Sequence, residues 1–189
     1  MLGPFHVPGS PARDHGARID EKAAGVPTWV HGTVGSTDGR ALVGAELHVW
    51  QNGDNELYAV HDRDAPESHL RGRFRTRKDG SYGFVAVRPT PYPIPGDGPV
   101  GAMLATTGRH PWRPAHIHVI VRAAGHHPVT THLFDDSSPY LDSDAVFAVK
   151  PSLVRHFEHH EADDPETPAG TSGEWYSLES DFVLSPVDQ

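Results

Sequence analysis

Proline and glycine interrupt this chain at short intervals, which limits the elements that it can form. Its 189 residues include 18 prolines and 19 glycines. Proline lacks a backbone N–H and glycine favours turns, so neither sustains a long helix or a long central strand. With 37% hydrophobic residues, the chain can still bury a single core at this length. The sequence therefore predicts one all-β domain built from many short strands.

Period-two alternation places these strands along the chain. The segment GAELHVW, residues 44–50, alternates apolar and polar side chains, as a half-buried strand does. The segment 71–87 repeats the pattern on both sides of a hairpin turn at Asp79–Gly80, although the sequence does not decide which face of its second half is buried. Further strands are predicted at residues 29–34, 116–125, 127–134 and 174–184. This pattern favours an antiparallel β-sandwich or barrel with long loops.

Three stretches are expected to lie outside the strand pattern. Residues 1–28 are rich in proline, glycine and charge, so we expect an extended N-terminal arm that precedes a folded domain at 29–189. Residues 88–103 contain five prolines and are expected to form a rigid loop. Residues 144–160 are expected to be partly helical after Pro151, which gives one or two short helices in all.

The charge balance and the absence of cysteine narrow the classes of partner. The formal net charge is −9, so neither a nucleic-acid interface nor an anionic membrane surface is expected. No apolar run approaches the roughly 20 residues that span a bilayer, and the N-terminus shows no signal peptide. Without cysteine the chain has no disulfide or thiolate chemistry. We expect a soluble, cytoplasmic protein.

Two of the fifteen histidines have an informative spacing. His116 and His118 occupy alternate positions at the start of an apolar strand, so their imidazoles should project from one face. Such a pair suits two ligands of one metal ion, but in a histidine-rich chain it equally describes a polar strand face. The histidines at 126–127 and within 156–160 are expected to be surface residues.

Two tyrosines favour the metal interpretation. Tyr92 lies between prolines in the segment YPIP, and Tyr58 follows the strand that ends at Trp50. A tyrosine is ordinarily a core or interface residue. A phenol becomes a metal ligand only where a strong Lewis acid, such as ferric iron, lowers its pKa far below about 10. Two histidines and two tyrosines together would form a hard site suited to Fe(III).

Ordered sequence segments also carry a family resemblance. The segments are LGPFHVPGSP, GAELHVWQNGDNELY, LRGRFRTRKDGSYGFVAVRP, YPIPGDGPVG, GRHPWRPAHIH, VTTHLF and YLDSDAVFAVK. In this order they resemble the catalytic domain of intradiol ring-cleavage dioxygenases, non-haem Fe(III) enzymes that use O₂ to open catechol-type rings between the two hydroxyls. The resemblance implies a β-sandwich that holds one Fe(III) per chain between sheets and loops.

The resemblance assigns roles to individual residues. It places the iron ligands at Tyr58, Tyr92, His116 and His118, with Tyr92 as the ligand that departs when substrate binds. It places a catalytic arginine at Arg113, three residues before the first ligand histidine. The positive charge of this arginine would stabilise negative charge on the substrate ring.

One position bears on the substrate. Catechol-cleaving members usually carry glutamine where this chain has His132, which we expect to orient Arg113 or a substrate hydroxyl, unless it is only a polar residue at a strand end. The segments THLF and YLDSDAVFAVK are more similar to hydroxyquinol 1,2-dioxygenases. The resemblance thus favours hydroxyquinol (benzene-1,2,4-triol), opened to maleylacetate, over catechol or a substituted catechol opened to a cis,cis-muconate. This would be a step of aromatic hydrocarbon catabolism.

The resemblance also suggests pocket walls, and the chain departs from the family in two places. By position, we expect Pro4, Leu42, Ala45 and Phe147 to contact substrate. Larger members carry a helical N-terminal dimerisation domain, which we expect to be absent here, so any homodimer would use another interface. The family commonly has glycine two positions before the first tyrosine ligand, where this chain has Glu56.

Two other protein classes remain as alternatives. A non-enzymatic β-sandwich, such as a transthyretin-like or carbohydrate-binding module, would account for the strands but not for YPIP and RPAHIH together. A cupin-type metal enzyme also uses His-x-His, but it needs a glutamate four or five residues later, and VIVRAAG has none. Tightly bound iron would separate the dioxygenase from the binding module.

Overall fold

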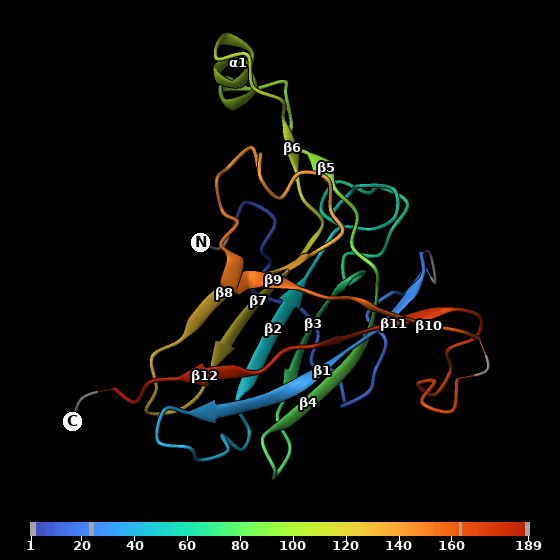
Figure 1. Cartoon of the computed structure of the whole chain (residues 1–189), viewed down its shortest axis with the longest axis vertical. Coiled ribbons are helices and arrows are strands. Elements are labelled where there is room, and N and C mark those ends of the chain that lie inside the picture. The colour runs from blue at the N-terminus through green and yellow to red at the C-terminus, as the bar shows by residue number, and fades with distance from the viewer. Residues whose placement is uncertain (1–2, 23–24, 163, 188–189) are drawn as a thin grey trace.

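The computed structural model describes residues 3–22, 25–162 and 164–187, and these form two facing β-sheets (Figure 1). The first sheet contains, in spatial order, β10 (Glu158–His160), β11 (Trp175–Glu179), β1 (Pro27–Ser36) and β12 (Phe182–Leu184), and β4 (Ser81–Val87) also pairs with β1. The second contains β3 (Arg71–Arg75), β2 (Glu46–Trp50), β7 (His116–Arg122), β8 (Val129–Asp135) and β9 (Val154–Arg155). The predicted β-sandwich is confirmed, with two open sheets in place of a barrel.

The pairing is mostly antiparallel. The exceptions are β1 with β11 and β12, and β8 with β9, which run parallel. A small separate ladder joins β5 (Tyr92–Pro93) to β6 (Trp112–Arg113). It ties the proline-rich segment to the chain just before β7, at the end of the sandwich from which α1 (Pro99–Thr106) projects (Figure 1).

The hydrophobic core fills the space between the two sheets. Leu47 and Val49 of β2 point into it, and Phe74 of β3 stacks on Phe84 of β4 with ring centroids 4.8 Å apart. Successive side chains of a strand alternate between its two faces. The inward positions of β2 and β7 are apolar, so their other positions face outward, and His48, His116 and His118 lie on that outer face.

The N-terminal arm runs beside the edge strands of both sheets, β3 and β4. Residues 3–22 contain several turns, with an isolated bridge from Ala12 to Arg73 of β3 and another from Arg18 to Val85 of β4. The Ile19 N–H donates to the Val85 carbonyl oxygen at 2.9 Å. Residues on both faces of β4 are buried from Tyr82 to Val87, which answers the question that the sequence left open. Residues 1–2 and 23–24 of the expected arm lie outside the described residues.

Two expectations about helices need correction. The stretch 88–103, expected to be loop throughout, contains the start of α1, because Pro99 occupies the first turn of the helix, where its missing N–H costs nothing. The stretch 144–160, expected to be partly helical, contains only the 3₁₀ turn η1 (Pro151–Leu153). After that turn the chain pairs with sheet edges as β9 and β10.

The C-terminal segment, expected as one strand, forms two. β11 and β12 both pair with β1, and the break between them lies where Gly32 meets Ser180. A Cβ atom at Gly32 would lie 2.2 Å from the Ser180 carbonyl oxygen, so only glycine allows this approach. Among the described residues, no helix has the length and apolar character needed to cross a membrane.

His48 lies beneath the arm on the outer face of β2. Its side chain is 4% exposed, and its Nδ1 is 3.2 Å from Nε2 of His6. Burial, and then the neighbouring charges of His6 on the arm and of arginines on β3 and β7, lower the pKa of His48 to about 4. The folded protein therefore holds this imidazole neutral at pH values where a solvated histidine is charged.

We expect His48 to make the fold sensitive to acid. Its stabilising contribution is complete above the unfolded-state pKa of about 6.5 and is lost as the pH falls towards 4, because only the unfolded chain takes up the proton. Between about pH 7 and pH 4.5, the wild type should lose about 2–3 kcal/mol more unfolding free energy than a His48→Gln variant. Urea denaturation at both pH values measures this, and equal losses in the two proteins would contradict it.

Candidate metal centre

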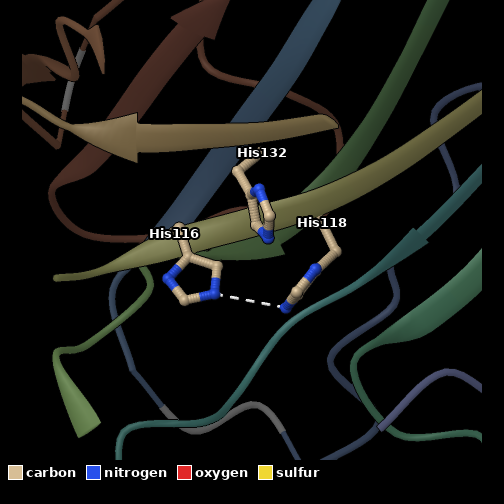
Figure 2. Close-up of side chains that lie close together, drawn as sticks. All are labelled: His116, His118 and His132. Carbon is tan, nitrogen blue, oxygen red and sulfur yellow. Dashed lines mark hydrogen bonds between the residues drawn. The ribbon is translucent and has the colours of Figure 1, made fainter. Parts of the chain in front are cut away.

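Three histidines meet on the outer face of the second sheet. The strand register pairs Trp50 of β2 with His118 of β7, and His118 with His132 of β8. His116 shares this face because Ile117, between the two histidines, points into the core. Figure 2 shows the imidazoles of His116, His118 and His132 converging from the two adjacent strands. The same-face placement expected from the spacing is present.

The ring nitrogens are close enough to share one ion. His116 Nε2 and His118 Nε2 are 3.2 Å apart (Figure 2), and one nitrogen of each of the three histidines lies within 4.8 Å of the other two. His116 Nδ1 donates to the Pro114 carbonyl oxygen at 2.6 Å. This bond fixes the ring tautomer and leaves the Nε2 lone pair of His116 free for a metal ion.

Both predicted tyrosines lie at this cluster. The Tyr58 hydroxyl, from the loop after β2, is 3.2 Å from His118 Nε2. The Tyr92 hydroxyl, from β5, lies 3.4 Å from Nη1 of Arg113, and that nitrogen is 3.1 Å from His116 Nε2. The structure therefore brings together all four residues expected as ligands and the expected arginine.

Burial sets the charge state of the cluster. It raises the pKa of Tyr58 well above its usual value and lowers the pKa values of His116 and His118 well below theirs. Burial, and then the Arg113 charge, lower the pKa of His132 to about 4. Near neutral pH the cluster therefore presents neutral imidazoles, and Tyr58 keeps its proton unless a cation displaces it.

These donors fit a strongly Lewis-acidic cation. The Nε2 atoms of His116 and His118 approach each other at 3.2 Å inside a buried site, an arrangement that a shared cation stabilises. Two phenols at the same point, Tyr58 and Tyr92, become anionic ligands only next to a cation strong enough to lower their pKa values. Ferric iron has that strength and prefers hard oxygen donors.

Asp144 is a site residue that the sequence reasoning missed. Its carboxylate is 3% exposed and pairs with the guanidinium of Arg113, with 3.1 Å between Oδ1 and Nε. The two residues lie far apart in sequence, and no spacing rule links them. The only available signal was the segment YLDSDAVFAVK, which carried the family resemblance and contains Asp144.

The cluster forms one end of a cavity of about 330 Å³. Its other walls are mostly apolar, and they come from the arm, from the loop around β5 and α1, and from the segment after Asp144. They include Gly3, Pro4, Phe5, Ile94, Pro95, Val100, Val146 and Ala148. Among the lining residues, the polar side chains are Tyr92, Asp97, Arg113, His118 and His132. A cavity of this kind suits a small aromatic ligand with a few hydroxyl groups.

The expected pocket walls lie in different places. Pro4 lines the cavity. Leu42 and Ala45 belong instead to the core between the sheets, because they precede β2 at the end of the strand opposite Trp50. Phe147 is 77% exposed and packs against the Arg109 guanidinium, 3.8 Å from its ring centroid, while its neighbours Val146 and Ala148 face the cavity. Leu42, Ala45 and Phe147 are therefore not cavity walls in this structure, and the lining residues named above form the walls instead.

Glu56 adopts a backbone conformation that suits glycine. Its φ is +64°, in the left-handed region, two residues before Tyr58. A side chain in this region costs about 1–2 kcal/mol relative to the right-handed one. We expect a Glu56→Gly variant to gain about 0.5–1 kcal/mol of unfolding free energy, since glycine removes the strain but loses more backbone entropy. Thermal or urea denaturation measures the change, and a loss of stability would contradict it.

The sequence matches a known family and several characterised relatives. The family described as "Dioxygenase" matches residues 1–186. The chain is 46% identical to a hydroxyquinol 1,2-dioxygenase of Nocardioides simplex, over 99% of this chain and 64% of that protein. It is 41% identical to a catechol 1,2-dioxygenase of Candida albicans, over 98% of this chain and 61% of that protein.

Solved structures show the same fold. The hydroxyquinol 1,2-dioxygenase of Pseudomonas putida DLL-E4 superposes with a TM-score of 0.91 at 42% identity, covering 99% of this chain and 65% of that one. The catechol 1,2-dioxygenase of Pseudomonas arvilla C-1 superposes with a TM-score of 0.93 at 28% identity, covering 100% of this chain and 62% of that one. The chain thus spans less than two thirds of the length of these relatives.

Proposed function

The chain belongs to the intradiol ring-cleavage dioxygenase family, and on that premise we propose that it opens the ring of a catechol-type substrate between its two hydroxyls, with O₂ as the oxidant. The observation that carries the proposal is the convergence of two histidines, two tyrosines and a buried arginine at one end of an apolar cavity. We also propose that the N-terminal arm contributes to this catalytic unit, which is supported by the presence of Gly3, Pro4 and Phe5 in the cavity wall.

The proposed cofactor is one Fe(III) per chain, held by Tyr58, Tyr92, His116 and His118. When bound, it would supply a Lewis acid that stabilises the substrate as its dianion and allows the ring to react with O₂ by charge transfer. The phenols offer the hard anionic oxygens that this ion prefers, and the imidazoles offer neutral nitrogens.

The chain's own residues would bind the substrate and manage charge and protons. Tyr92 lines the cavity with its Oη beside Arg113, and in its anionic, metal-ligating form it could accept a proton from an incoming substrate hydroxyl. The Arg113 guanidinium stabilises negative charge that develops on the ring, because it is preoriented in a site with little water. Phe5, Ile94 and Val146 exclude water from the reacting face.

Hydroxyquinol is the proposed substrate, converted to maleylacetate. A third ring hydroxyl needs a polar partner in a mostly apolar cavity, and the residues available for it are His132 and Asp97. The pKa of His132, about 4, leaves its imidazole neutral, so one ring nitrogen can donate a hydrogen bond and the other can accept one. The second candidate, catechol or a substituted catechol opened to a cis,cis-muconate, makes no use of this polar contact.

Oxygen uptake by the iron-loaded protein tests the reaction and the substrate together. We expect kcat/KM for hydroxyquinol to exceed that for catechol by about tenfold or more, since one matched polar contact is worth at least about 1–3 kcal/mol. A preference for catechol would support the proposed ring cleavage but would contradict hydroxyquinol as the preferred substrate. No uptake with hydroxyquinol, catechol or 4-chlorocatechol would overturn the reaction itself and favour a binding module on the same sandwich.

A further inference from the structure

The carboxylate of Asp144 is held from two directions. On one side, Oδ1 accepts from Arg113 Nε at 3.1 Å and Oδ2 accepts from Nη2 at 3.4 Å. On the other side, the backbone N–H of Val146 donates to Oδ1 at 3.3 Å and that of Ala148 donates to Oδ2 at 2.9 Å. The carboxylate therefore joins the arginine to the segment that follows it in the chain.

This pairing decides which edge of the guanidinium faces the site. Asp144 occupies Nε and Nη2, so Nη1 is the group left to point away from it. That nitrogen lies 3.1 Å from His116 Nε2 and 3.4 Å from the Tyr92 hydroxyl. A two-point pair of this kind fixes the plane of an arginine side chain as well as its position.

The same residue anchors a wall of the cavity. The Asp144 carbonyl oxygen accepts from Arg109 Nη2 at 3.1 Å, and the next N–H, of Ala145, donates to the Trp112 carbonyl oxygen at 3.0 Å. Val146 and Ala148, whose N–H groups bind the carboxylate, line the cavity. The Asp144 carboxylate therefore contacts both Arg113 and the backbone of this wall.

We propose that Asp144 is a positioning residue of the proposed ring cleavage, which acts on the reaction by holding Arg113 with Nη1 towards the reacting ring. The expected effect on kcat rests on the proposed function. The orientation of Arg113 by Asp144 does not depend on it. Asp144 is not among the residues that line the cavity. It acts on the reaction through Arg113.

The protein contains a matched control for this pair. Asp135, 2% exposed on β8, binds Arg88 through two oxygens at 2.8 and 3.3 Å. It also accepts from the N–H of Ser137, two residues later, as Asp144 does from Val146. None of these three residues lines the cavity. Asp135→Asn therefore removes the same charge from the same kind of pair without touching the proposed site.

Steady-state kinetics separate positioning from structural support. Asp144→Asn keeps the shape of the side chain, and we expect it to lower kcat about 10- to 100-fold with KM changed less than about threefold, since small misplacements of a charge-stabilising group act mainly on the transition state. Asp135→Asn should leave both constants within about twofold of the wild type. Equal kcat values for Asp144→Asn and the wild type would overturn the proposal.

A second background tests whether Asp144 acts through the arginine. In an Arg113→Met protein, adding Asp144→Asn should change kcat by less than about twofold, because the group to be positioned is already gone. A further tenfold loss in the double variant would mean that Asp144 acts by another route, and would overturn the proposal.

Crystal structures of the wild type and of Asp144→Asn give a readout that does not depend on activity. We expect the Arg113 guanidinium of the variant to rotate away from Tyr92, with a displaced chain at 146–148. An unmoved guanidinium would overturn the inference. If the wild type cleaves no catechol, the proposed function fails, while the two crystal structures still decide whether Asp144 orients Arg113.

Discussion

An Arg113→Met variant is expected to lose about 10²–10³-fold in kcat, the usual cost of removing one preoriented charge-stabilising donor. Arg113 is 5% exposed and its Nη1 lies within 3.4 Å of the Tyr92 hydroxyl and 3.1 Å of His116 Nε2. It therefore provides positive charge at the point where substrate oxygens would enter. Methionine keeps much of the side-chain length and removes the cation together with its N–H donors.

The same variant is expected to be less stable. Breaking a buried ion pair by removing one partner costs about 3–5 kcal/mol, because Asp144 would remain buried without its cation. Arg113→Lys serves as the comparison: it keeps the charge but cannot bind Asp144 through two nitrogens, so its kcat should lie between those of the wild type and Arg113→Met. Stopped-flow kinetics and urea denaturation measure the two effects. A kcat within threefold of the wild type in Arg113→Met would contradict the role given to Arg113.

Replacing Trp50 with alanine is expected to destabilise both the fold and the metal centre. Its indole is 1% exposed and stacks on the His118 imidazole, with centroids 4.7 Å apart and planes within 8°. Removing a buried tryptophan side chain costs about 3–5 kcal/mol. Loss of a contact that orients a metal ligand lowers metal affinity by about 10- to 100-fold, so the variant should also retain less iron against a chelator.

Trp50→Phe separates the stacking from the rest of the side chain. The Trp50 Nε1–H is buried and has no hydrogen-bond partner among the described residues, so phenylalanine removes no bond seen there and keeps an aromatic ring against His118. We expect its unfolding free energy to stay within about 1.5 kcal/mol of the wild type, and its iron affinity to stay close. If Trp50→Ala retained iron as firmly as Trp50→Phe, the stacking on His118 would have no part in the site.

Local periodicity accounts for the features that the sequence predicted well. The alternation in residues 44–50 placed Leu47 and Val49 in the core and left Trp50 on the opposite face, as the structure has them. The two-residue spacing of His116 and His118 likewise placed both imidazoles on one side of a strand. These are properties of a strand by itself, and they do not depend on which strand lies beside it.

Features that depend on the pairing of distant segments were missed. The row from Trp50 to His118 to His132 exists only because β2, β7 and β8 pair in that register. Asp144 meets Arg113 only once the segment after β8 folds back over β6. Leu42 and Ala45 were misplaced because distance along β2 from Trp50, and not chemical type, decides which apolar residues reach the cavity.

The visible absorption spectrum of the protein, purified in air and without substrate, tests the central claim most directly. Tyrosinate bound to Fe(III) predicts a broad visible band and a red-brown colour, which should be lost or clearly weakened in Tyr58→Phe and in Tyr92→Phe. Tyr82→Phe, which alters a buried tyrosine bonded to the Ser180 carbonyl oxygen on the core side, should keep the band. A protein that stays colourless after iron loading would contradict the assignment of these four ligands and of the chemistry that depends on them.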